Sequence, residues 1–153
     1  METLERLLTE NPMFNDLDKE TLQTILGCVS NVRFDAGQFL FKEGEDAQRF
    51  YVIREGTVAI EVFHLERGAI PLQHLEAGEI VGWSWLVAPY KWRFDARALT
   101  RVRAFAFDGA CLRGKCVENP RLGYELLKRF ARVLETRLQA TRRQLVEAHA
   151  RTL

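Results

Sequence analysis

The chain has 153 residues, of which 47% are hydrophobic and 28% are charged, a composition ordinary for a water-soluble globular domain. Its 22 basic and 21 acidic residues give a formal net charge of +1, so the overall charge favours neither nucleic acid nor anionic lipid as a partner. No apolar run approaches the roughly 18–20 residues that span a bilayer, and the N-terminus lacks the continuous apolar core of a signal peptide. We therefore expect one cytoplasmic domain without a membrane segment.

Residues 1–28 are predicted to form two short helices. The first can run from Thr3 to Leu8. The second can begin after Asp18 and continue to Leu26, because an aspartate side chain accepts hydrogen bonds from the free N–H groups at a helix start.

Residues 29–107 carry the pattern of many short strands. Turn signals separate the strands at a spacing near ten residues, which favours a sandwich or small barrel over a parallel α/β sheet. In one strand Val58, Ile60 and Val62 alternate with less apolar residues, which predicts a single buried face. The predicted strands are 29–34, 39–42, 49–54, 57–63, 70–75, 79–82, 94–99 and 102–107.

Residues 78–99, GEIVGWSWLVAPYKWRFDARAL, differ most from ordinary strand or helix sequence. They hold all three tryptophans, Trp83, Trp85 and Trp92. A short apolar run meets Gly82 and an aromatic stretch, and beyond a proline the residues alternate as in a half-buried strand. A strand, an irregular aromatic turn and a second strand are predicted to form one wall of a binding pocket.

Residues 108–153 return to a helical pattern. Asp108 can cap a short helix through Leu112. An Asn-Pro pair then supplies a cap and a first-turn proline for a long helix, predicted from Arg121 to about Ala150.

Apolar residues of the long helix recur at intervals of three and four, which is the spacing of a helix–helix seam. Because a helix of this length is unusual on a small domain, we expect a partner helix from a second copy of the chain. The alternative is a helix that packs only on its own barrel. The seam residues are Phe130, Leu134, Leu138, Leu145 and Ala148, with Thr141 between them.

The cysteines and histidines do not form a recognisable metal or catalytic set. Cys28, Cys111 and Cys116 give no even disulfide framework and no CxxC pair, so we interpret them as buried or free thiols in a reducing cytosol, not as metal or iron–sulfur ligands. The three histidines are scattered, and the sequence has no P-loop, HExxH or dinucleotide fingerprint. We therefore do not expect an enzyme.

Two stretches carry a resemblance to a known family. AGQFLFKEGEDAQRFYVIREGTVAI (36–60) resembles the opening barrel signature of cyclic-nucleotide-binding domains, with Gly37, Gly44 and Gly56 at the family's turn positions. RLQATRRQL (137–145) resembles the long helix of the catabolite activator proteins, the Crp/Fnr group.

The resemblance covers nearly the whole chain and implies a mainly β fold with flanking α-helices. The expected architecture is a cyclic-nucleotide-binding-type β-roll, which is a double-stranded β-helix or jelly roll. Within one domain, it implies N-terminal helices at 1–28, the roll at 29–107, and a short helix with a long dimerisation helix at 108–153.

The family's binding residues are only partly kept. Family members carry a Gly followed by a Glu that binds the ribose hydroxyl, and about nine residues later an Arg that binds the cyclic phosphate. Here Gly82 matches, Trp83 takes the Glu position, and Trp92 lies nine residues on, followed directly by Arg93. The resemblance thus implies that the ribose acceptor is absent and that the phosphate cation is either lost or moved to Arg93.

Several interpretations of this pocket stay open. In one, cAMP or cGMP binds atypically, with its phosphate at Arg93 and its ribose at Ser84 or Asp95. In another, Trp83 and Trp92 fill the pocket themselves or stack on a flatter, less polar ligand. In a third, the tryptophans are core at the end of the barrel, with their indole N–H groups bonded to backbone carbonyls.

Two residues of the long helix are further candidate ligand contacts. Thr141 and Arg142 lie where the Crp group uses a Thr–Ser pair to reach the base across the dimer. The alternative for Thr141 is a threonine tolerated in a helix seam. For Arg93 and Arg97, the alternative to an anion contact is a solvated or salt-bridged strand face.

The sequence therefore predicts a small cytoplasmic sensor or regulatory protein of the Crp/Fnr type. A small-molecule ligand would close the 78–99 wall onto the long helix and bias two arrangements of a homodimer. Two alternatives stay open: a ligand-free interaction scaffold with a tryptophan-plugged pocket, and a transcription regulator whose DNA-binding part is missing. Because Crp/Fnr regulators continue into a helix-turn-helix domain and this chain ends at Leu153, we do not expect this chain alone to bind nucleic acid.

Overall fold

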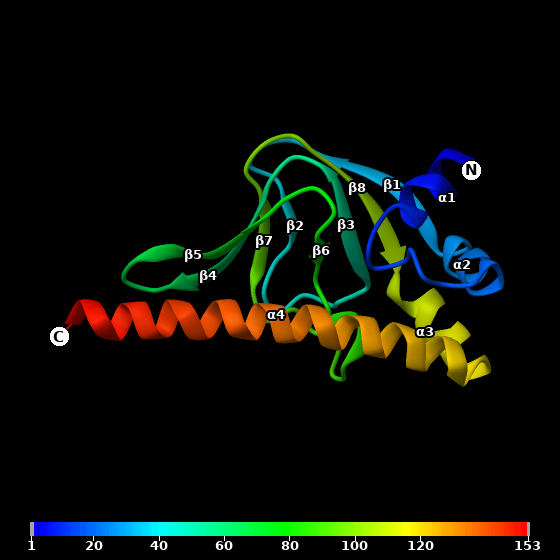
Figure 1. The fold of residues 1–153 in the computed structure, drawn as a ribbon. Coiled ribbons are helices and arrows are strands. Elements are labelled where there is room, and N and C mark those ends of the chain that lie inside the picture. The colour runs from blue at the N-terminus through cyan, green and yellow to red at the C-terminus, as the bar shows by residue number, and fades with distance from the viewer. Residues whose placement is uncertain (1, 153) are drawn as a thin grey trace.

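Two four-stranded antiparallel sheets, ordered β1-β8-β3-β6 and β2-β7-β4-β5, form the centre of the computed structural model, which describes residues 2–152 (Figure 1). The mainly β fold with flanking helices, a β-roll, is the one that the sequence predicts, and every strand lies within two residues of its predicted bounds. The strands are β1 (Val29–Phe34), β2 (Phe39–Phe41), β3 (Arg49–Glu55), β4 (Val58–His64), β5 (Gly68–Leu75), β6 (Ile80–Val81), β7 (Asp95–Ala98) and β8 (Val102–Asp108).

Helices precede and follow the roll in the sequence. Asp18 and Asp108 cap α2 and α3 as predicted: their Oδ1 atoms accept hydrogen bonds from the backbone nitrogens of Thr21, at 2.7 Å, and Cys111, at 3.0 Å. Across residues 2–152, none of the helices has both the length and the apolar character of a membrane span. The helices are α1 (Glu2–Thr9), α2 (Lys19–Leu26), the short 3₁₀ helix η1 (Ser84–Leu86), α3 (Gly109–Glu118) and α4 (Pro120–Thr152).

The long helix α4 lies along one end of the roll and continues past it (Figure 1). It has 33 residues, as the predicted long helix requires. The β4–β5 hairpin extends beside its C-terminal half, where Gln144 Nε2 donates a hydrogen bond to the Leu72 carbonyl. Thus α4 contacts the roll near its middle and the hairpin farther along.

Five aromatic rings, which we call the aromatic column, join the N-terminal segment, the roll and α4. They are Phe14, Phe107, Phe50, Trp85 and Phe130. Phe50 stacks on Phe107 with 4.3 Å between ring centroids and on Trp85 with 5.1 Å, and Phe130 of α4 meets Phe50 edge-on at 5.0 Å. Aromatic pairs at these separations add to the hydrophobic stabilisation of a core.

Phe130 therefore corrects part of the predicted seam, because it is fully buried in the chain's own core. The leucines of the predicted seam are exposed on the surface of α4. Leu134, Leu138 and Leu145 remain 37%, 51% and 59% exposed. The N-terminal half of α4 thus packs on its own barrel through Phe130, and its outer face carries exposed leucines.

Strand β4 corrects the prediction of a single buried face. Val58, Ala59, Ile60 and Glu61 are all buried, with Glu61 only 3% exposed. The reason is Arg97 of the neighbouring strand β7, whose Nε and Nη2 donate hydrogen bonds to the two Glu61 carboxylate oxygens at 2.9 and 2.8 Å. Arg97 is thus part of a salt-bridged strand face.

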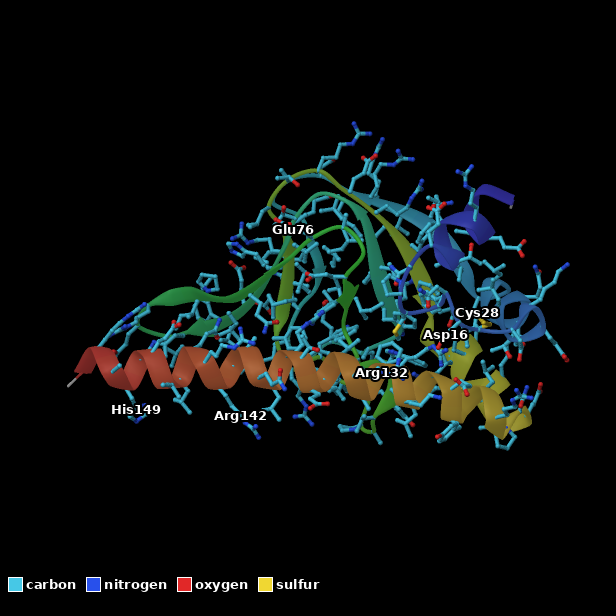
Figure 2. The ribbon with its side chains drawn as sticks, in the orientation of Figure 1. Asp16, Cys28, Glu76, Arg132, Arg142 and His149 are labelled. Atoms are coloured by element: carbon cyan, nitrogen blue, oxygen red, sulfur yellow. A yellow bond between two sulfur atoms is a disulfide. The ribbon has the colours of Figure 1, made fainter. Side chains whose placement is uncertain are left out.

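The expectation of three free thiols is wrong for two of the cysteines, because Cys28 and Cys111 form a disulfide (yellow in Figure 2). Cys28 directly precedes β1, and Cys111 lies in the first turn of α3, which directly follows β8. Since β1 pairs with β8, the two residues are brought side by side. Cys116 is free and half-buried, and burial raises the pKa of its thiol.

Candidate functional site

The predicted pocket wall consists of β6, η1 and β7, and Gly82 is its tightest point. Gly82 has φ +93°, a conformation that residues with a Cβ rarely adopt. A Cβ at position 82 would also lie 2.5 Å from Cη2 of Trp92. The glycine is therefore required by both its backbone and the ring packed against it.

Trp92 fills the space in front of Gly82. Its ring stacks on Phe41 of β2, with 3.6 Å between centroids and 6° between planes, and only 3% of Trp92 is exposed. Its backbone is held by two hydrogen bonds, from its own N to the Glu45 carbonyl at 3.0 Å and from Gly44 N to its carbonyl at 2.9 Å. The residue at the family's phosphate position is thus a buried aromatic ring.

Trp83 connects the wall to α4. It is half-buried, and its ring meets Phe94 edge-on at 5.5 Å. The guanidinium of Arg137, from α4, lies 5.6 Å from the Trp83 ring centroid, and its Nη2 donates a hydrogen bond to the Ile80 carbonyl. A cation over an indole face is attracted by the ring quadrupole, so Arg137 links α4 to both β6 and the aromatic wall.

Ser84 and Trp85 belong to the interior of the wall. Ser84 is buried at the start of η1, and Trp85 is fully buried in the aromatic column. The Trp85 Nε1–H has no hydrogen-bond partner, in contrast to the interpretation in which indole N–H groups bond to backbone carbonyls. The carbonyl of Trp85 accepts a hydrogen bond from Arg113.

Arg93 and Asp95, the other candidate nucleotide contacts, lie on either side of buried Phe94. Arg93 is exposed and forms no ion pair with any residue that the structure describes. Asp95 is half-buried, and its Oδ1 already accepts a hydrogen bond from the Glu43 backbone nitrogen at 2.8 Å. Arg93 is therefore an exposed cation, and the Asp95 carboxylate already has one backbone partner.

Thr141 and Arg142 lie on the exposed part of α4. The Thr141 hydroxyl donates to the Arg137 carbonyl at 2.9 Å within the helix, and Arg142 extends away from the roll (Figure 2). The structure thus brings Gly82, Trp83 and Trp92 together with one another, whereas Arg142 is not gathered with them.

Sequence reasoning did not single out the residues that complete this site. Phe41 and Phe94 pack on the tryptophans, and Arg137 covers Trp83. The apolar positions of the predicted strands 39–42 and 94–99 were the available signal for the two phenylalanines. No local pattern distinguishes Arg137 from the other arginines of a basic helix.

Two hollows flank Arg137 beneath α4. The α4 cavity, of about 340 Å³, lies between α4, residues 11–13 and residues 78–80. The β5 cavity, of about 500 Å³, lies between residues 71–75 and the next turns of α4. Burial lowers the pKa of the Arg137 guanidinium, and Glu79 acts in the opposite direction.

The chain is similar to known proteins in both sequence and fold. The sequence profile of the cyclic nucleotide-binding domain matches residues 31–119. The chain is 29% identical over 112 residues to a cAMP-dependent protein kinase regulatory subunit of Dictyostelium discoideum, covering 72% of this chain and 34% of that protein. It is 25% identical over 144 residues to a CRP-like cAMP-activated global transcriptional regulator of Mycobacterium tuberculosis, covering 94% of this chain and 62% of that protein.

Among solved structures, the chain is similar to a protein of Geobacter metallireducens described as a cyclic nucleotide-binding protein. The TM-score is 0.77 at 28% sequence identity, over 90% of this chain and 96% of the other. The chain thus spans about a third to three fifths of the two curated relatives but nearly all of this solved one.

Proposed function

This chain belongs to the cyclic nucleotide-binding domain family, and on that premise we propose that it is a small sensor or regulatory module of the Crp/Fnr type whose roll is closed by its own tryptophan. The named relatives are a regulatory subunit and a transcriptional regulator. We accordingly propose regulation by binding, without catalysis. In this proposal, neither cAMP nor cGMP occupies the usual place in the roll.

The observation that carries the proposal is the stack of Trp92 on Phe41. A cyclic phosphate is an anion, and burying an anion requires a cation or several donors around it. At the corresponding position the roll instead holds the Trp92 indole ring. Trp92 is 3% exposed, and its ring centroid lies 3.6 Å from that of Phe41. Trp83 at the ribose position offers no carboxylate either.

We propose that the module is a homodimer through the outer face of α4. Leu134, Leu138 and Leu145 recur at helix-seam spacing and are more than a third exposed. The proposed location is the cytoplasm. Disulfides are uncommon in reducing compartments, so the Cys28–Cys111 bond is the feature of the structure that argues against this location.

The direct test is a titration of the purified protein with cAMP and with cGMP. Tryptophan fluorescence and melting temperature are followed together, because all three tryptophans lie in the wall. We expect no saturable change in either signal up to millimolar nucleotide, since entry would require Trp92 to leave Phe41.

A second candidate function is atypical nucleotide sensing, which one observation favours: Arg93 is exposed and has no ion-pair partner among residues 2–152. A nucleotide would displace Trp92 and place its phosphate on Arg93. Saturable binding at micromolar nucleotide that is lost in Arg93→Ala would establish this candidate and refute the closed roll.

A further inference from the structure

The walls of the α4 cavity come from three segments that are far apart in the sequence. Asn11 bridges two of them, since its Nδ2 donates to the Gly78 carbonyl at 3.0 Å while its Oδ1 accepts from Met13 N at 2.8 Å. Arg129 connects the third segment, α4, to residues 11–13, because its Nε donates to the Met13 carbonyl at 2.8 Å. Arg129 is only 3% exposed. These hydrogen bonds connect the three segments that surround the hollow.

Three arginines of α4 line this cavity, and they are not equally neutralised. Arg129 forms ion pairs with Asp16 and Glu125. Arg132 and Arg137 form no ion pair with any residue in the described part of the chain. Arg132 lies close enough to Asp16 to help lower the pKa of that carboxyl group. The cavity thus presents two guanidinium groups that are not directly ion-paired.

Arg137 is the more informative of the two. It is half-buried, and its guanidinium contacts the Ile80 carbonyl and the face of the Trp83 ring. Glu79 lines the same cavity and is close enough to favour the charged guanidinium, but it makes no direct contact with it. A partly desolvated guanidinium that is not ion-paired is stabilised by an incoming anion, to which it can donate parallel hydrogen bonds.

Part of the remaining wall is apolar, and Asn11, Glu79 and Thr136 are its polar members. Pro12, Met13, Ile80 and Val133 line the hollow between the two arginines. Its volume of about 340 Å³ lies at the lower end of the range for small-molecule sites. These features select a compact ligand with one negative group and an apolar body.

We propose that the α4 cavity is a binding site for a small monoanionic organic acid, whose carboxylate is held by Arg137 and Arg132 and whose apolar part packs on Met13, Ile80 and Val133. The site lies outside the roll, so it goes beyond the proposed function and does not depend on whether the roll admits a nucleotide. Because Arg137 also covers Trp83, an acid bound there changes the contact between α4 and the aromatic wall.

The test is an NMR titration of the ¹⁵N-labelled protein with benzoate, with benzamide as the neutral probe of the same shape and inorganic phosphate as the anion without an apolar body. We expect saturable shifts with benzoate at the amides of residues 11–13 and 78–80 and at the Trp83 indole. Benzamide and phosphate are expected to bind at least roughly tenfold more weakly, because benzamide lacks the negative charge and phosphate lacks the apolar body.

Matched variants locate the site. Arg137→Gln is expected to weaken benzoate binding about tenfold, Arg132→Gln by a smaller factor, and Glu79→Gln to tighten it about two- to threefold by removing the opposing charge. Arg143→Gln, an exposed arginine of α4 that lines neither hollow, is the control and should bind as the unaltered protein does. Arg132 is exposed, so its replacement leaves the fold intact even if Arg137→Gln does not.

The proposal is overturned if benzoate and benzamide behave alike, if phosphate binds as well as benzoate, if Arg143→Gln weakens binding as much as Arg132→Gln does, or if no saturation is reached at millimolar benzoate. None of these outcomes bears on the closed roll, which is tested by cAMP and cGMP and by shifts at β7. The two proposals can therefore fail separately.

Discussion

At the scale of single residues, Gly82 and Trp92 form one unit, because the ring occupies the space that a side chain at position 82 would need. Sequence alone placed both residues at family positions and indicated that the phosphate cation is either lost or moved to Arg93. It could not show that the Trp92 ring turns inward, because its partner Phe41 belongs to a different strand. The direction of a side chain in an irregular turn depends on contacts that no local pattern records.

Gly82→Ala tests this unit against a matched control. Gly44 has nearly the same backbone, with φ +90°, but nothing within 4 Å of its virtual Cβ. Gly44→Ala should cost only the left-handed strain, roughly 1–2 kcal/mol. Gly82→Ala should cost about 1–3 kcal/mol more, because Trp92 must move. Urea denaturation of both variants measures the difference.

Equal losses in the two variants would show that Trp92 yields freely and that the roll is not firmly closed. The contact can be confirmed by combining Gly82→Ala with Trp92→Leu. The smaller side chain leaves room for the methyl group, so the extra cost of the alanine should largely disappear in that background.

At the scale of elements, strand bounds followed from the sequence because glycine turns mark most strand ends. The faces of the strands did not follow equally well. Alternation predicted that Glu61 lies on a solvated face of β4, yet Arg97 of β7 covers it. A local pattern predicts that a charged residue is exposed, and only the neighbouring strand shows that it is paired.

The length of α3 also differs from the prediction. The helix continues past Leu112 to Glu118, since its internal Gly114 is tolerated.

The pairing of β4 with β7 predicts a specific pH dependence. The hydrogen bonds from Arg97 hold the pKa of Glu61 below its ordinary value. The resulting stabilisation is therefore present at neutral pH and is lost as the pH falls through that lowered pKa, below roughly pH 4. Glu61→Gln should remove this part of the acid sensitivity, so its stability curve should be flatter than that of the unaltered protein there.

Thermal unfolding of both proteins between neutral pH and pH 3 measures the effect. Asp16, Asp18 and Glu125 also have lowered pKa values, and they contribute equally to both curves. Only the difference between the curves reports on Glu61. Parallel curves would mean that the ion pair does not contribute to stability.

At the scale of the whole molecule, the resemblance to cyclic-nucleotide-binding domains predicted the β-roll, and the helical sequence pattern predicted the long helix beside it. The Cys28–Cys111 bond could not be predicted, because it depends on the pairing of β1 with β8 and not on cysteine spacing. The prediction that Phe130 belongs to a seam with a second copy is wrong. Phe130 matches the periodicity of Leu134 and Leu138 but lies where α4 still covers the aromatic column.

A charge in the proposed seam should separate the dimer without unfolding the chain. Leu138 is 51% exposed, so Leu138→Lys costs little within one chain but would bury an unpaired ammonium group between two. Gln139→Lys, on the next position of α4, adds the same charge outside the leucine stripe and is the control. Light scattering after gel filtration should give a monomer for the first variant and a dimer for the second.

The same measurement on the unaltered protein decides the proposal itself. A monomer at tens of micromolar chain would refute the homodimer, as would a dimer that survives Leu138→Lys. Circular dichroism of each variant shows whether the chain has remained folded.

The length of α4 has a mechanical consequence. With a rise of about 1.5 Å per residue the helix is roughly 50 Å long, and some 22 Å of it lie beyond Arg137. A stiff rod anchored near its middle is a lever: a tilt of about 10° at Arg137 would carry its far end about 4 Å sideways. The hydrogen bond from Gln144 to Leu72 would move the β4–β5 hairpin with it. A small movement at the Arg137 guanidinium would thus become a displacement of several ångströms at the end of α4, which could alter a contact with another protein.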